Sequence, residues 1–194
     1  MGLPSNDAGL SLLSFLLLLA VVVSGVAAIW DFRTGKIPNW LTMGAAATGM
    51  IGQGCAGWLT AHSLAALATQ LGLALAGAIV CGVVPLILFR ARALGGGDVK
   101  LLAAIGILCL PSQGLGAETY AFVIALLMVP FVLIHQGTLV TTLRRSWTLL
   151  VRPFHRQKQS EQHALDPSEH TWFRLGPAIF LGTLTMYINQ FSRP

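Results

Sequence analysis

Two aspartates stand where long apolar stretches of this chain meet its basic loops. The 194 residues include only seven acidic ones, and Asp31 and Asp98 are the two that adjoin predicted helix ends on the arginine- and lysine-bearing side. Two carboxyl groups close in space do not both ionise readily, so the pair shares a proton. One carboxyl group can then act as a base and the other as an acid. The residue types therefore favour acid–base chemistry without a covalent intermediate, with either aspartate in either role.

Read singly, each aspartate also has a structural explanation. Asp98 follows three glycines at 95–97 and would make an N-cap for the helix after it. Asp31 would pair with Arg33 or Lys36 in a solvated loop. The functional interpretation depends on their shared location, because Asp31 ends one apolar segment and Asp98 begins another at the same membrane face. An ionisable side chain at such a position is a functional candidate.

The helices that must position these residues follow from composition. The chain is 55% hydrophobic and 10% charged, with a mean hydropathy of +0.72, which excludes a soluble globular domain. An all-α, polytopic membrane bundle of about six transmembrane helices is expected. The predicted spans are roughly 10–30, 39–59, 64–89, 99–110, 119–142 and 175–191. The fourth offers only about 18 Å of helix against a bilayer core of about 30 Å. It must therefore extend past Pro111, thin the bilayer or lean on neighbouring helices.

The positive charges predict the orientation of the chain in the membrane. Eleven of the 12 lysines and arginines lie in three loops, between the first and second, third and fourth, and fifth and sixth spans. Basic loops favour the cytoplasmic side, so both termini are expected outside the cytoplasm. Asp31 and Asp98 then lie at the cytoplasmic face of an inner membrane. The net charge of +5 is a topology signal and does not indicate a nucleic-acid partner.

We interpret residues 1–194 as a single membrane-embedded domain. The first apolar segment is too long for a cleavable signal peptide and has no preceding lysine or arginine, so it is predicted to be retained. Residues 143–154 have the spacing of an amphipathic helix on the cytoplasmic leaflet. Residues 152–173 are polar and contain two prolines, which predicts a solvated cytoplasmic connector.

The remaining reactive side chains do not form familiar sites. The cysteines at 55, 81 and 109 stand singly, without a C-x-x-C pair, and are expected to be small buried hydrophobes. The five histidines have no metal-ligand spacing, and no serine-nucleophile motif is present. We therefore expect neither a metal nor a cofactor.

Three segments carry a family resemblance. Asp31 to Asn39 reads D-F-R-T-G-K-I-P-N, Gly95 to Gly106 reads G-G-G-D-V-K-L-L-A-A-I-G, and a Gly-Pro pair opens the last apolar segment at Gly176. In this order, at matching helix ends, they resemble the D-x-R-x-x-x-I-P-N, G-x-G-D-x-K-L-L-A-A-x-G and G-P elements of type IV prepilin peptidases. The resemblance extends from Asp31 to Gly182.

The resemblance implies a membrane aspartic endopeptidase with Asp31 and Asp98 as its catalytic pair. Its substrate would be a prepilin or pseudopilin, cut after the short basic leader on the cytoplasmic side. Long members of that family carry N-terminal cysteine motifs and also methylate the new pilin N-terminus. This chain lacks those motifs and is similar to the short forms of Flp or tight-adherence pilus systems, so methylation is not expected.

Other residues of the two motifs are expected to shape an active-site loop. Gly95, Gly96 and Gly97 would allow unusual backbone angles, close approach of an extended substrate, or a hinge. Pro38 and Asn39 would direct the second span and so aim Asp31. Lys100 would either favour the ionised form of Asp98 or anchor at lipid phosphate. Arg33, which belongs to the first motif, is also expected to be a substrate or active-site loop residue.

Two other functions are open on the sequence alone. A small ion- or proton-coupled transporter would use the aspartates as ion sites, although no inverted repeat is apparent. A catalytically inert scaffold for pilus assembly would keep the helices and could dispense with either aspartate. Membrane lipid is an expected partner in every case, and a second copy of the chain is left open.

Overall fold

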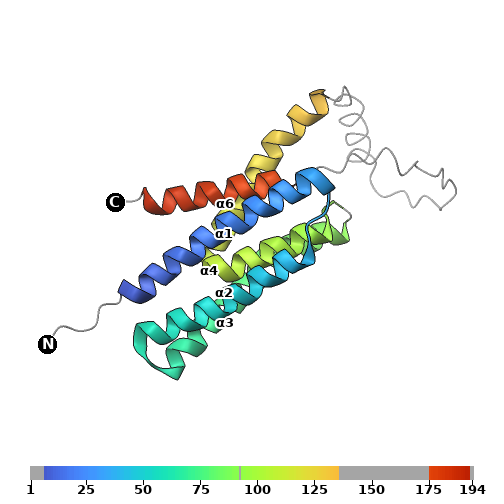
Figure 1. The fold of residues 1–194 in the computed structure, drawn as a ribbon. Coiled ribbons are helices and arrows are strands. Elements are labelled where there is room, and N and C mark those ends of the chain that lie inside the picture. Colours follow the sequence, from blue (N-terminus) through green and yellow to red (C-terminus); the bar gives the residue numbers. More distant parts are fainter. Residues whose placement is uncertain (1–6, 92, 136–174, 193–194) are drawn as a thin grey trace, which may run out of the picture. The chain divides into compact units, whose positions relative to one another are not determined.

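The computed structural model describes residues 7–91, 93–135 and 175–192. Within these ranges all regular structure is α-helical, which confirms the predicted all-α class. The helices are α1 (Asp7–Thr34), α2 (Asn39–Ala61), α3 (Leu64–Arg90), α4 (Gly96–His135) and α6 (Gly176–Phe191) (Figure 1). The predicted amphipathic segment at 143–154 and the connector at 152–173 lie outside the described residues.

The chain divides into two compact units, and the helices near the aspartates belong to the first. This unit comprises Met1–Ile124 and Arg174–Pro194, so it contains α1, α2, α3, α6 and α4 as far as Ile124. Within it α1 packs against both α2 and α6, and α2 packs against α3 (Figure 1). The second unit, Ala125–Phe173, is described only over the remaining part of α4.

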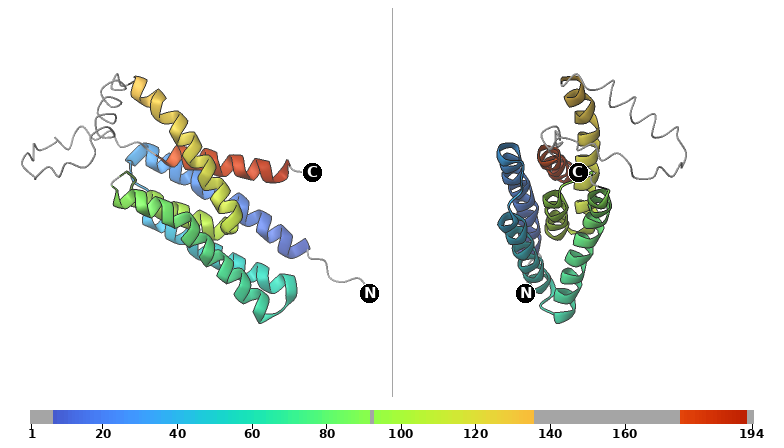
Figure 2. Two further views of the ribbon diagram at one scale, coloured as in Figure 1. Left: turned by 180° about the vertical axis from the view of Figure 1, so that it is seen from behind. Right: turned by 90° about the vertical axis from the view of Figure 1, so that its right-hand side faces the viewer.

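Several helix ends gather at one end of the first unit. The C-terminal end of α1 lies beside the N-terminal ends of α2, α4 and α6, as both views of Figure 2 show. The first helix stops where Gly35 adopts a positive φ of 66°, and the Gly35 N–H donates to the Asp31 carbonyl oxygen at 2.8 Å. Glycine suits this left-handed position because it has no Cβ. The short loop that follows leads directly to Pro38, which caps α2 in an extended conformation.

Helix α4 is two helical segments joined by a sharp break at Leu110, where φ is 63° and ψ is 168°. Pro111 follows and has no N–H to donate to the Ile107 carbonyl, which lies one helical turn earlier. The fully buried Gln53 of α2 supplies donors instead. Its Nε2 lies 3.4 Å from the Ile107 carbonyl oxygen and 2.9 Å from that of Leu108. A side chain from another helix therefore satisfies carbonyl groups that the break leaves without their usual partners.

The short segment before Leu110 corresponds to the predicted fourth span. Its side chains at Leu101, Leu102, Ile105 and Leu108 are each at most 2% exposed. The segment is thus enclosed by protein along its length, and the break prevents a continuous helix past Pro111. Packing against neighbouring helices, one of the three ways in which a short span was expected to fit the membrane, is therefore present in the structure.

Three of the described helices are long and apolar enough to cross a bilayer: Gly9–Thr34, Leu64–Arg90 and Gly96–Met128. Helix α6 has 16 residues and would cover about 24 Å at 1.5 Å per residue. Helix α2 contains five glycines, three threonines and Gln53, which lower its hydropathy. The membrane character of the chain is therefore supported by three helices, and the count of about six spans stays a prediction.

Candidate active site

Asp31 lies inside the last turn of α1 and is buried. Its exposed fraction is 7%, and its Oδ2 accepts a hydrogen bond from the Gly176 backbone N–H at 3.2 Å. Arg33 and Lys36 are exposed, and neither forms an ion pair with Asp31 within the described ranges. The alternative in which Asp31 pairs with a basic residue in a solvated loop is therefore wrong. The longer first helix, which continues to Thr34, is what carries the side chain into the protein.

Asp98 is the third residue of α4 and is half-buried. It does not cap the helix, because the helix already begins at Gly96. Its backbone N–H donates to the Gly95 carbonyl oxygen at 3.2 Å. The carboxyl group folds back over the same residue, since a Cβ added at Gly95 would lie 3.2 Å from Asp98 Oδ2. The residue before Asp98, Gly97, lies against Ile37 of the loop that follows Asp31, so the structure brings the segments that carry the two acids together.

Among the three glycines before Asp98, Gly97 allows a close approach between two segments, and none of the three has a positive φ. Gly35 is the one described glycine with a positive φ, so Gly95, Gly96 and Gly97 have backbone angles open to other residues. The expectation of unusual backbone angles is therefore wrong. A Cβ at Gly97 would meet the Cβ of Ile37 at 3.1 Å, tighter than ordinary van der Waals contact. The absence of a side chain at Gly97 allows the start of α4 to lie against the loop that follows Asp31.

A second contact joins the same two segments. Lys100 Nζ donates a hydrogen bond to Asn39 Oδ1 at 2.9 Å. Asn39 is the first residue of α2, and Lys100 lies in the first full turn of α4. Lys100 was expected to act on Asp98 or on lipid phosphate, and the observed partner is instead the asparagine of the other motif. The contact fixes the starts of the two helices relative to each other.

The other predicted loop residues lie around these contacts. Pro38 is half-buried and precedes α2, as expected for a residue that sets the helix direction. Arg33 is exposed on the last turn of α1 and is not brought to the aspartates. Trp30 and Trp40 pack edge to face, with ring centroids 5.8 Å apart. Exposed tryptophans beside arginine and lysine are typical of a membrane–water interface.

Gly176 is the site residue to which the sequence patterns assigned no role. The Gly-Pro pair was noted as part of a motif, but no contact with Asp31 was expected from it. Gly176 is 145 positions from Asp31, so hydropathy and local spacing give no signal for the interaction. The motif itself was the available clue, because glycine followed by proline at a helix start permits close packing at that point.

Together the three segments form a polar cluster at one end of an apolar bundle. Two carboxyl groups, one backbone N–H and a lysine–asparagine contact lie within it. No three His, Cys, Asp or Glu side chains gather as a potential metal site in the part of the chain that the structure describes. The arrangement gathers the segments that carry two acids, and one of these acids, Asp31, accepts a hydrogen bond from the start of α6. Such a pair is suited to proton transfer to and from a bound water and a polarised carbonyl group.

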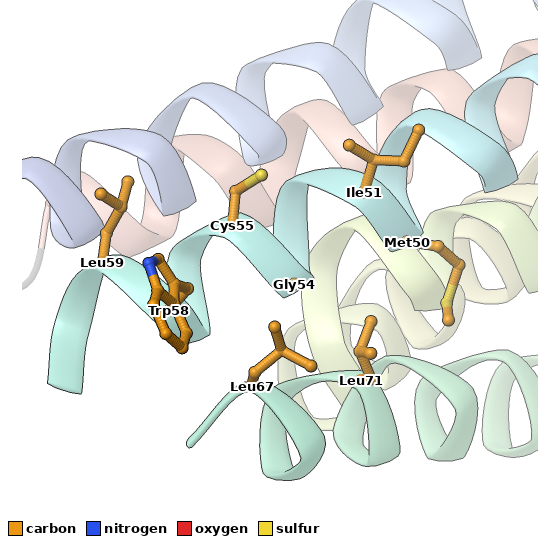
Figure 3. A pocket seen from close by; sticks show the side chains of 8 residues that line it. All are labelled: Met50, Ile51, Gly54, Cys55, Trp58, Leu59, Leu67 and Leu71. Atoms are coloured by element: carbon orange, nitrogen blue, oxygen red, sulfur yellow. The ribbon is translucent and has the colours of Figure 1, made fainter. Parts of the chain in front are cut away.

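A separate apolar groove of about 640 Å³ lies between α2 and α3 and offers no acid–base group (Figure 3). It is lined by Met50, Ile51, Gly54, Cys55, Trp58, Leu59, Leu67 and Leu71. Met50 is already about 16 Å along α2 from Asn39 at 1.5 Å per residue. The groove also corrects the expectation for the cysteines, because Cys81 and Cys109 are buried but Cys55 is exposed on the groove wall.

Comparison with known protein families gives one match. The profile of the type IV leader peptidase family matches residues 12–134, a range that includes both aspartate motifs and ends before α6. No curated protein and no solved structure matches the chain.

Proposed function

Because this chain belongs to the type IV leader peptidase family, we propose that it is an aspartic endopeptidase that removes the short basic leader of a prepilin or pseudopilin. Asp31 and Asp98 form the catalytic pair. Cleavage takes place at the cytoplasmic face of a bacterial inner membrane, just before the apolar helix of the substrate. The observation that carries the proposal is the meeting of three distant sequence segments around these two acids.

The proposed reaction needs a base, an acid and a bound water. One aspartate removes a proton from the water, which attacks the scissile carbonyl carbon. The other donates its proton to the carbonyl oxygen. As the tetrahedral intermediate collapses, the C–N bond breaks, the first aspartate gives the proton it took from water to the leaving nitrogen, and the second aspartate takes back a proton from a hydroxyl group of the intermediate. The enzyme returns to its starting protonation state, and no covalent bond to the chain forms.

The burial of Asp31 supports this mechanism. A carboxyl group withdrawn from bulk water interacts more strongly with a neighbouring acid than an exposed one does. Asp98 is half-buried and lies at the start of its helix, so it remains accessible from the loop side. An extended peptide can approach there because the glycines at 95–97 present no side chains.

We extend the proposal to the membrane topology. The break at Leu110 divides α4 into two segments, which gives six helical segments among the described residues, in the order expected from the sequence. The short helices are covered by their neighbours, which compensates for their limited length. Both chain termini would then lie outside the cytoplasm, with the aspartates and basic loops on the cytoplasmic side.

The test is co-expression with a candidate prepilin in a host that lacks prepilin peptidase activity. Wild type is compared with Asp31→Asn, Asp98→Asn and the doubly substituted chain, and leader removal is followed by gel shift. Glu118→Gln is the matched control, because Glu118 is a buried carboxyl outside the three segments. Processing by wild type and by the Glu118 variant, but not by the Asn variants, is the expected result. Continued processing by either single Asn variant would exclude the aspartate pair.

A further inference from the structure

The first residue of α6 makes the one hydrogen bond to the Asp31 side chain that is found among the described residues. The Gly176 N–H donates to Asp31 Oδ2 at 3.2 Å, and both residues are buried. Leu175, just before the helix, is 3% exposed, and Ile179 N–H donates to its carbonyl oxygen at 3.0 Å. The start of α6 is therefore an ordered helix end that faces Asp31 directly.

A helix start has properties that suit it to hold a carboxylate. Its first N–H groups have no acceptor within the helix, and the aligned peptide dipoles place a partial positive charge there. Pro177, the next residue, has no N–H. Gly176 therefore provides the backbone donor at this point of α6. Because Oδ2 accepts a hydrogen bond from this donor, the direction of the Asp31 carboxyl group is set.

Only glycine fits at position 176 without movement of Asp31. A Cβ added there would lie 2.8 Å from Asp31 Oδ2, 2.9 Å from Asp31 Cβ and 3.2 Å from Ala28 Cα. Separations under 3.0 Å are essentially absent for real Cβ atoms. The nearest backbone neighbour, Ala28, belongs to the same turn of α1 as Asp31 and offers no flexible side chain that could yield.

We propose that Gly176 is a positioning residue for Asp31, and that its N–H and its missing side chain together fix the Asp31 carboxyl group in its working orientation. The inference rests on the proposed function of the aspartate pair. It extends the site to the last helix, beyond residues 12–134 that match the family profile. A positioning role affects the rate of the chemical step and leaves substrate binding unchanged.

The test uses the full chain, purified in detergent, with a prepilin substrate at varied concentration. Gly176→Ala is compared with Gly44→Ala, a helical glycine with nothing within 4 Å of an added Cβ. We expect the Gly176 variant to lose about 10- to 100-fold in kcat, the scale of a displacement of about 1 Å in an active site, with KM within about twofold of wild type. The Gly44 variant should match wild type. A Gly176→Ala enzyme with wild-type kcat would overturn the inference.

A second measurement serves if Gly176→Ala lowers stability. Amide hydrogen exchange at Gly176 is followed by NMR in chain labelled with ¹⁵N-glycine, for wild type and for Asp31→Ala. If the carboxyl group holds the Gly176 N–H, exchange at this amide should accelerate by at least about tenfold in the variant, while Gly44 is unaffected. Unchanged exchange at Gly176 would overturn the inference.

The two proposals fail in different ways. If Asp31→Asn continues to cleave, the aspartate pair itself is excluded. If Asp31→Asn is inactive and Gly176→Ala has wild-type kcat, the pair stands and only the role of Gly176 is lost.

Discussion

Asp31 and Glu118 are both buried carboxyl groups on apolar helices, with exposed fractions of 7% and 2%, but their surroundings differ. Asp31 lies where several helix ends meet and accepts a backbone hydrogen bond, and the segment that carries Asp98 packs against the loop that follows Asp31. Glu118 lies after the break in α4, and neither of its carboxyl oxygens has a hydrogen-bond partner within the described residues. Burial alone therefore does not separate the two carboxyl groups. The backbone donor and the nearby segment of Asp98 set Asp31 apart.

The two regions also hold their helices together by different means. The aspartate end uses polar contacts between loops and helix starts, such as that of Lys100 with Asn39. Near the break, an added Cβ at Gly106 would collide with the Gly77 carbonyl group, and one at Gly114 would lie 3.1 Å from Gly106 Cα. Small residues allow helices within a membrane to approach in this way. We infer that the close glycine contacts near the break stabilise the helix packing. The polar contacts at the aspartate end would instead position the side chains of the proposed site.

The largest expected effect on folding comes from filling the glycine contact near the break. Gly106→Ala would drive a methyl group against the Gly77 carbonyl, and such overpacking costs about 1–3 kcal/mol or more. We expect a clear fall in the thermal midpoint in detergent. Gly72→Ala is the control, because nothing lies within 4 Å of a Cβ there. Equal midpoints for the two variants would contradict the structural role of the contact.

A smaller effect is expected from the contact between the two motif loops. Its hydrogen bond is exposed, and such bonds contribute about 0.5–1.5 kcal/mol. Lys100→Ala and Asn39→Ala should each slow cleavage by roughly 2- to 10-fold. A double-mutant cycle on the cleavage rate checks the interaction, because the double variant should lose no more than either single one. Losses that multiply would show that the two residues act separately.

The smallest effect is expected at Glu118. Glu118→Gln keeps the shape of the side chain and removes an acid that has no partner within the described ranges. We expect the cleavage rate to remain within about twofold of wild type, with stability unchanged or higher, since an unpaired buried charge is costly. A loss comparable to that of an Asp31 variant would erase the contrast between the two carboxyl groups.

The positions of the helices were predictable from sequence, because hydropathy and helix-breaking residues report on them directly. Predicted segments at 39–59 and 64–89 correspond to α2 and α3 within two residues at each end. The short segment before Pro111 was also identified, but the contact that satisfies its last carbonyl groups was not. It depends on Gln53, a polar residue of α2 whose partners are more than 50 positions away.

The two acids of the candidate site could be predicted from the sequence, but the contacts that support them could not. Asp31 and Asp98 were found from motif residues and from the expected topology. The contacts of Asp31 with Gly176 and of Lys100 with Asn39 join residues that are far apart in the chain, and local patterns carry no information about such pairs. Of the reasons given for the three glycines, unusual backbone angles are wrong, because close approach to Ile37 explains Gly97, while substrate approach and a hinge stay predictions.

Catalysis by the aspartate pair is tested most sharply by single-turnover cleavage of a prepilin by purified wild type, Asp31→Asn, Asp98→Asn and the doubly substituted chain. Acid–base catalysis by a positioned side chain contributes about 10²- to 10⁴-fold. Each single variant should lose at least about 100-fold, and the double variant should lose no more, because the pair acts as one unit. A single variant that retains the wild-type rate, or losses that multiply in the double variant, would contradict catalysis by the pair.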